Sequence, residues 1–105
     1  MTELYARISQ EKAKKMIDTL DKYIILDVRT KEEYENGHIK GAINIPNEEI
    51  FDEDILNENL DTPILVYCRS GRRSLNASAK LGLLGYTKIY EFGGINTWKY
   101  EMETK

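Results

Sequence analysis

Residues 63–84 read PILVYCRSGRRSLNASAKLGLL. The apolar run at 63–67 begins with proline, which a strand tolerates at its first position, and predicts a buried strand. Cys68 then opens a polar loop that contains glycine and continues to Arg72. A helix is expected from about Arg73 to Leu84, because Gly85 ends the pattern there. A strand, a loop and a helix in this order indicate an α/β domain, in which ligands bind beyond the carboxyl ends of the strands.

The rest of the chain alternates short β-rich runs with helical segments, which is typical of a mostly parallel sheet. Further strands are expected at residues 5–8, 23–28, 42–45 and 88–92, and Gly93-Gly94 should break the last of them. Helices are expected after the potential cap Ser9, after a capping box at 30–33, from Asn47 through Leu56, and from Ile95 to Met102. We expect these segments to form one compact domain over residues 1–105.

Composition excludes several classes of function. The formal net charge is −3, with acidic and basic residues interspersed, so we expect no nucleic-acid partner. The first residues lack the pattern of a signal peptide, and the apolar runs are too short for a membrane span. The single cysteine cannot form an intrachain disulfide or a cysteine-based metal site, so we expect no metal and no cofactor. A free thiol persists most easily in a reducing compartment, and the cytoplasm is the expected location.

Cys68 stands at the start of a predicted helix and beside three arginines, Arg69, Arg72 and Arg73. A helix N-terminus offers unpaired N–H groups and the positive end of the helix dipole. These groups and the arginine charges favour the thiolate form of a cysteine, which is its nucleophilic form. The same positive field would attract an anionic substrate. The loop therefore predicts a reactive cysteine with an anion-binding site around it.

Other interpretations of this loop stay open. A lone cysteine is often a small, inert buried residue, and arginines beside it are then simply solvated. A Cys-x5-Arg loop would indicate a cysteine phosphatase, but here Arg73 is the fifth residue after Cys68, and the shorter loop favours a small terminal sulfur over a phosphate ester. A small phosphatase or arsenate reductase is the weaker alternative. His38 lies in a turn-like segment, where a structural hydrogen bond is expected rather than base catalysis.

Four segments, one of which contains the cysteine loop, form a specific set. They are Leu26-Asp27-Val28-Arg29 with Glu32-Glu33-Tyr34, GHIKGAINIP at 37–46, VYCRSGRRS at 66–74, and GGINTW at 93–98. In these segments, which span nearly the whole chain, the sequence resembles a single-domain rhodanese. The resemblance implies a three-layer α/β fold with a central five-stranded, mostly parallel sheet flanked by helices.

The resemblance also implies roles for the loop residues. Cys68 would be the catalytic nucleophile, and the backbone amides of residues 69–73 would hold its persulfide. The arginine side chains would attract the donor anion. The implied substrate-binding residues are Arg69, Ser70, Gly71, Arg72 and Arg73.

Other matched residues are expected to support the site. Asp27 and Arg29 should form a buried polar network, because a charge at a strand end needs partners. Glu33 could serve its capping box alone or could also pair with a loop arginine, and both possibilities stay open. Structural roles are expected for Gly41, Gly93 and Gly94 in the backbone geometry, and for Trp98 as a core anchor.

The function implied by the resemblance is that of a sulfurtransferase. Sulfane sulfur would pass from thiosulfate or a persulfide donor, through a Cys68 persulfide, to cyanide or a thiol. No second cysteine is present in the sequence to resolve the persulfide, so a partner protein with an acceptor thiol is expected. The alternative is a non-catalytic persulfide carrier or signalling module of the same fold, although such silent versions usually lose the cysteine.

Overall fold

The computed structural model describes residues 4–52, 55–56 and 58–104. Its centre is a five-stranded sheet in the order β1-β6-β5-β2-β4, and every neighbouring pair is parallel. The strands are β1 (Ala6–Arg7), β2 (Ile24–Asp27), β4 (Ile43–Asn44), β5 (Ile64–Cys68) and β6 (Ile89–Gly94). The expected five-stranded parallel sheet is confirmed. Because β5 is the central strand, its carboxyl end places Cys68 in the middle of one edge of the sheet.

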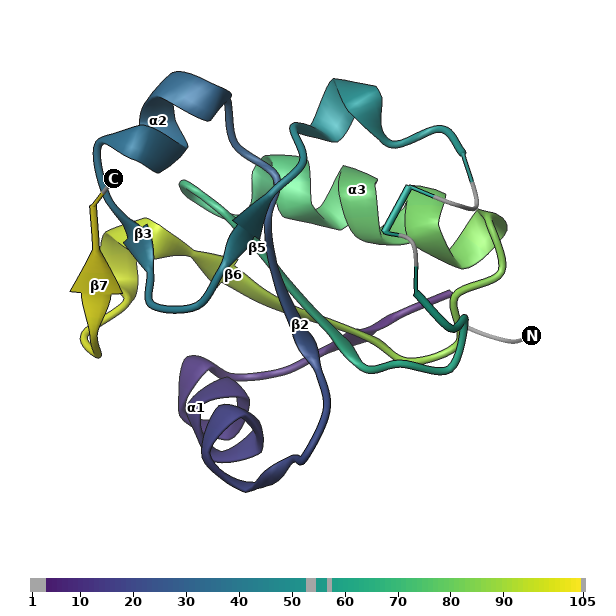
Figure 1. The fold of residues 1–105 in the computed structure, drawn as a ribbon, viewed down its shortest axis with the longest axis horizontal. Coiled ribbons are helices and arrows are strands. Elements are labelled where there is room, and N and C mark those ends of the chain that lie inside the picture. The colour runs from purple at the N-terminus through teal and green to yellow at the C-terminus, as the bar shows by residue number, and fades with distance from the viewer. Residues whose placement is uncertain (1–3, 53–54, 57, 105) are drawn as a thin grey trace.

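Helices cover both faces of this sheet (Figure 1). α1 (Gln10–Thr19) lies on one face, and α3 (Arg72–Leu83) lies on the other. The remaining elements are α2 (Lys31–Glu35), the 3-10 turns η1 (Asn47–Glu49) and η2 (Ile95–Thr97), and an antiparallel pair of β3 (His38–Ile39) with β7 (Met102–Glu103). In the described part of the chain, no helix has the length and apolar character that crossing a membrane requires.

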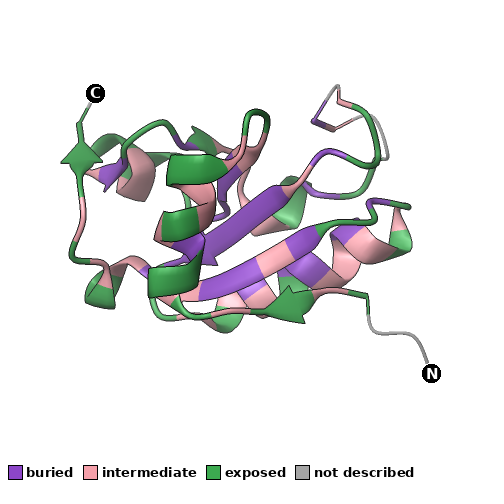
Figure 2. Cartoon of the chain, turned by 90° about the horizontal axis from the view of Figure 1, so that it is seen from below, coloured by how far each residue is buried: buried purple, intermediate pink, exposed green. Residues whose placement is uncertain are grey.

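β5 is buried along its whole length and supplies side chains to both halves of the core (Figure 2). Successive side chains of a strand point to opposite faces of a sheet. Ile64, Val66 and Cys68 accordingly pack in the apolar cluster that includes residues of α3. Leu65 and Tyr67 pack in the cluster that includes residues of α1. Cys68 therefore faces α3, the helix that begins just after its own loop.

The local signals for the starts of α1 and α2 are confirmed. The Ser9 side chain caps α1 by accepting a hydrogen bond from a backbone N–H of the first turn at 3.0 Å. Thr30 and Glu33 form both hydrogen bonds of a capping box at α2. α3 begins at Arg72, one residue earlier than predicted, and follows Gly71. The short-range contacts of Ser9 and Thr30 fix where α1 and α2 begin.

The predicted helix from Ile95 to Met102 is wrong. Only Ile95–Thr97 forms a 3-10 turn, and the chain then runs on into β7. β7 pairs with β3, which gives its backbone groups partners far away in the sequence. Tertiary pairing has therefore overridden the local pattern. Gly93 and Gly94 also continue β6, where a break was expected.

The predicted helix after Asn47 is wrong as well. Among the described residues of this stretch only η1 forms, and it begins at Asn47. Lys80 of α3 donates to the carbonyl oxygen of Asn47 at 2.7 Å, and Ile50 is buried in the cluster beside α3. Tertiary contacts thus hold this segment in place of a helical ladder. Residues 53–54 of the predicted helix lie outside the described residues.

Candidate functional site

Cys68 lies at the floor of its loop, with 1% of its surface exposed. The backbone N–H of Gly71 donates to Sγ at 3.0 Å, and Sγ lies 3.3 Å from Oγ of Ser74. The buried sulfur thus faces an N–H donor at the start of α3. The sequence did not predict this burial, which an inert core cysteine would also show. The N–H donor directed at Sγ is the feature that an inert cysteine does not require.

Two glycines let the loop close over the sulfur. Gly71 has a φ of 102°, a conformation that residues with a side chain rarely adopt. A Cβ on Gly94 would overlap the carbonyl oxygen of Arg69, so β6 approaches the loop closely at this point. The N–H of Asn96 donates to the same carbonyl at 3.2 Å. The predicted backbone role of Gly94 is confirmed, and its contact fixes the loop against β6.

Arg73 reaches from the loop to α2. Its two terminal nitrogens donate to the two carboxylate oxygens of Glu33 at 2.7 and 3.0 Å. Glu33 also completes its capping box with Thr30, so it serves both of the roles that the sequence left open. The hydrogen bond from Arg73 is the main cause that lowers the pKa of Glu33 to about 2, and the same bond raises the pKa of Arg73. The charge of Arg73 is thus compensated within the protein.

The Arg73–Glu33 pair predicts a loss of stability in acid. Because the pKa of Glu33 is about 2 in the folded protein against an ordinary 4.5, the pair stabilises the fold fully above pH 4.5 and loses this contribution as the pH falls toward 2. Over this interval, Glu33→Gln should lose less free energy of unfolding than the wild type, as measured by urea denaturation at a series of pH values. Glu32→Gln, an exposed position on the same helix, is the matched control and should follow the wild type. Equal losses in Glu33→Gln and the wild type would contradict this role of Glu33.

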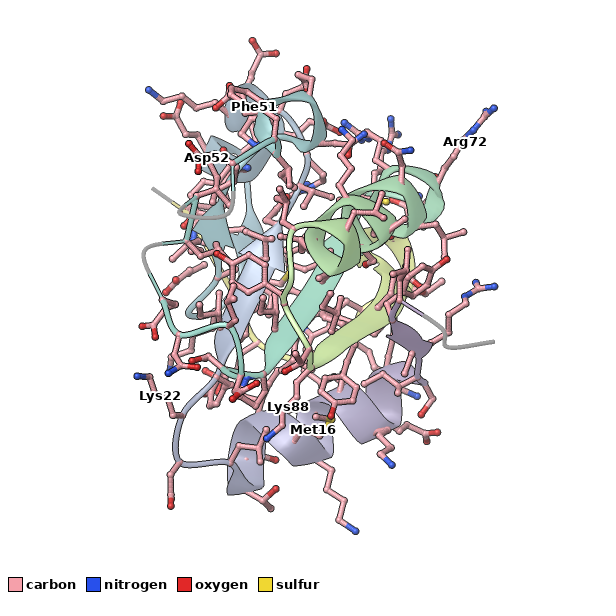
Figure 3. The ribbon with its side chains drawn as sticks, turned by 90° about the vertical axis from the view of Figure 1, so that its right-hand side faces the viewer. Met16, Lys22, Phe51, Asp52, Arg72 and Lys88 are labelled. Atoms are coloured by element: carbon pink, nitrogen blue, oxygen red, sulfur yellow. The ribbon has the colours of Figure 1, made fainter. Side chains whose placement is uncertain are left out.

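Arg69 and Arg72 carry the uncompensated charge of the loop. Both are exposed, and within the described ranges neither forms a salt bridge. Figure 3 shows Arg72 extending away from the body of the protein. An open pocket of about 370 Å³ lies beside the loop, and Arg69 lines it together with Asn96. The predicted residues 69–73 therefore form one continuous loop, in which Ser70 is also exposed. Arg69 and Arg72 are available to an anion.

Asp27 and Arg29 form the buried network that the sequence predicted. Arg29 donates through Nε and Nη2 to the carboxylate of Asp27 at 2.6–3.0 Å. The hydroxyl of Tyr67 donates to Oδ2 of Asp27 at 2.6 Å and accepts from the N–H of Ile39 at 3.1 Å. Burial, with Asp27 alongside, raises the pKa of Tyr67. Since Tyr67 directly precedes Cys68, this network braces the strand that carries the cysteine.

His38 and Trp98 have the structural roles expected of them. The ring of His38 stacks on Tyr34 with centroids 3.7 Å apart, and its Nδ1 lies 2.8 Å from the Tyr34 carbonyl oxygen. Nε2 of His38 lies 3.2 Å from the carboxylate of Glu103. Trp98 packs against Phe92 in the core cluster beside α1, with ring centroids 5.4 Å apart. His38 is thus held between α2 and β7.

Two polar residues behind the cysteine were not predicted. Ser74, in the first turn of α3, accepts a hydrogen bond from the Cys68 thiol and donates to the carboxylate of Glu91. Glu91 lies in β6, where 1% of its surface is exposed. The available signal was an acidic residue inside the predicted strand at 88–92, because a buried charge requires a partner.

This arrangement agrees with a known protein family. Residues 9–101 match the family described as the rhodanese-like domain. The chain belongs to this family. The rhodanese-like region includes α1, the cysteine loop and Glu91, whereas the strands β1 and β7 lie outside it.

Relatives of this rhodanese-like chain carry names from sulfur chemistry. The thiosulfate sulfurtransferase GlpE of Pseudomonas entomophila is 34% identical over 96 residues, which cover 90% of this chain and 85% of the relative. The putative sulfur carrier protein YrkF of Bacillus subtilis is 38% identical over 98 residues, which cover 91% of this chain and 52% of the relative. A structure of a rhodanese with anions from E. coli has a TM-score of 0.72 and 31% identity, over 79% of this chain and 99% of that chain. The fold of this chain is therefore the rhodanese fold.

Proposed function

We propose that this rhodanese-like chain is a sulfurtransferase that carries sulfur on Cys68. The observation that supports this most is the hydrogen bond of 3.0 Å from the Gly71 N–H to Sγ at the start of α3, beneath a loop with two uncompensated arginines. A thiolate stabilised in this way is a nucleophile, and the positive loop suits a small anionic donor. The names of the relatives support sulfurtransferase or sulfur-carrier activity.

The proposed reaction consists of two displacements. The Cys68 thiolate attacks the outer sulfur of thiosulfate, so that a bond forms from Sγ to that sulfur. The bond to the sulfonate sulfur breaks, and its electron pair leaves with sulfite. The N–H groups of residues 69–73 and the arginines hold the anionic persulfide. Cyanide or an acceptor thiolate then attacks the outer sulfur, and the electron pair of the broken bond returns to Sγ.

We propose a thiol of another protein as the physiological acceptor. The 105 residues contain one cysteine, so no second thiol within them can receive the sulfur. The open pocket of about 370 Å³ beside Arg69 gives such a thiol a place to approach the loop. A free nucleophilic thiol persists in a reducing compartment, and we therefore propose the cytoplasm as the site of action.

Formation of thiocyanate from thiosulfate and cyanide tests the proposed activity. Arg69→Gln and Arg72→Gln should each raise KM for thiosulfate by about 2- to 5-fold, which is the size expected for an exposed charge. Lys88→Gln removes the same charge at the other end of the molecule (Figure 3) and should leave KM unchanged. Turnover of an aryl phosphate with no thiocyanate formation would overturn the proposal in favour of a phosphatase.

The second candidate is a persulfide carrier that does not turn over. The burial of Cys68 favours it, because a buried sulfur would protect a stored persulfide from solvent. The name of YrkF points the same way. A carrier would gain one sulfur atom from a donor but would form no thiocyanate, whereas a sulfurtransferase would do both.

A further inference from the structure

Glu91 is a buried carboxylate that the sulfur transfer described above does not use. It lies in β6, between β5 and β1, with 1% of its surface exposed. Oε2 accepts from the Gly93 N–H at 2.9 Å and from the hydroxyl of Ser74. Oε1 lies 3.4 Å from Nε of Arg7, whose side chain is 69% exposed. A buried charge costs free energy unless it is well paired, and an exposed arginine is a weak partner.

Ser74 links this carboxylate to the nucleophile. Its Oγ lies 3.3 Å from Sγ of Cys68 and bonds Oε2 of Glu91, while the carbonyl oxygen of Gly93 is farther away at 3.4 Å. A serine hydroxyl has one proton to donate. When Cys68 is a thiol, its S–H donates to Ser74 and Ser74 donates to the carboxylate. When Cys68 is a thiolate, Ser74 must turn its proton toward the sulfur, and Glu91 can then bond Ser74 only as a carboxylic acid.

We propose that Glu91 takes up the proton of the Cys68 thiol through Ser74. The thiol proton moves to Oγ of Ser74, and the proton of that hydroxyl moves to Oε2 of Glu91. The pair changes from thiol and carboxylate to thiolate and carboxylic acid, and its net charge does not change. Glu91 touches no reacting atom and is a positioning residue that acts through Ser74. This inference rests on Cys68 being the nucleophile of the proposed function.

The surrounding groups favour this exchange. A thiolate and a carboxylate separated by one hydroxyl would repel each other in a buried site, so the pair shares a single proton. On the sulfur side, the Gly71 N–H donates to Sγ, and the nearby charge of Arg73 attracts a thiolate. On the carboxylate side, Arg7 at Oε1 and the Gly93 N–H at Oε2 oppose protonation, but Arg7 lies mostly in solvent, and a protonated Oε2 keeps a lone pair that can accept from Gly93. The neighbouring Gln10 is neutral and donates to backbone carbonyls of β6.

The stored proton also closes the reaction cycle. Glu91 keeps the proton while the thiolate attacks the donor and the persulfide forms. When the acceptor removes the outer sulfur, the electron pair returns to Sγ and regenerates a thiolate in the buried site. Glu91 still holds the proton at this point, so the free protein returns to the pair of thiolate and carboxylic acid, which is its resting state at neutral pH. The proton never has to cross the exposed loop, where the donor and the acceptor approach.

Infrared spectroscopy at neutral pH tests this proposal. Exposed carboxyl groups are ionised there, so a carboxylic-acid C=O band reports a protonated buried carboxyl. We expect this band in the wild type, together with the ultraviolet absorption of a thiolate. The band should disappear in Glu91→Gln, and also in Cys68→Ser, because a serine hydroxyl does not ionise. Ser74→Ala removes the bridge and should lose both signals and slow the alkylation of Cys68.

The Cys68→Ser variant shows whether Glu91 is protonated because it has taken up the thiol proton or only because it is buried. A carboxyl that is protonated only because it is buried would keep its band in Cys68→Ser, and this result would overturn the proposal. Absence of the band in the wild type would overturn it as well. The comparison of wild type with Cys68→Ser decides the matter even if Glu91→Gln does not fold. Neither signal requires a sulfur donor, so a failure of sulfur transfer in the thiocyanate assay is distinguishable from a failure of the proton exchange.

Discussion

Cys68→Ser is expected to form no thiocyanate from thiosulfate and cyanide while it keeps the fold of the wild type. The substitution replaces a thiolate by a hydroxyl that stays protonated at neutral pH and does not attack sulfur. The volume changes little, and the Gly71 N–H and the Ser74 hydroxyl can bond an oxygen where they now bond Sγ. The free energy of unfolding should therefore change by less than about 1.5 kcal/mol, whereas turnover should fall to the uncatalysed rate.

The thiocyanate assay and urea denaturation should be run on the same preparation of Cys68→Ser. A folded variant without activity separates loss of the nucleophile from loss of the structure. Full turnover in a folded Cys68→Ser protein would remove Cys68 from the reaction and, with it, the proposed mechanism.

Asp27→Asn should cause the largest loss of stability among the substitutions considered. It removes the carboxylate that pairs with Arg29 and accepts from Tyr67, and it leaves the guanidinium of Arg29 buried without a counter-charge. Breaking a buried ion pair from one side costs about 3–5 kcal/mol. Urea denaturation measures this loss. Activity should fall too, because Tyr67 adjoins Cys68 in β5.

Asp18→Asn is the matched control for this effect. Asp18 pairs with Lys14 at 2.7 Å on the surface of α1, where solvent screens the interaction. The same chemical change should therefore leave the stability nearly unchanged. If Asp27→Asn lost no more stability than Asp18→Asn, the buried network would not brace β5 as described.

The strand, loop and helix around Cys68 could be predicted because their signals are local. Pro63 and the apolar run mark the strand, Gly71 marks the turn into α3, and the capping box at 30–33 marks α2. Each of these signals acts within a few residues. The family resemblance, carried by short motifs along the whole chain, then identified the parallel sheet and the rhodanese fold.

The features that escaped prediction depend on contacts between distant residues. The helix expected at 95–102 failed because β7 pairs with β3, more than 60 positions earlier in the chain. Whether Glu33 pairs with an arginine depends on its contact with Arg73, which lies 40 positions later in the chain. The burial of Cys68 and its link through Ser74 to Glu91 require β6 to lie beside β5, which no local pattern specifies.

Intact mass before and after incubation with thiosulfate, or with a persulfide donor, tests directly whether Cys68 carries sulfur. The wild type should gain the mass of one sulfur atom and lose it again when cyanide is added, and Cys68→Ser should gain none. A wild-type mass that stays unchanged with both donors would contradict sulfur transfer by this loop.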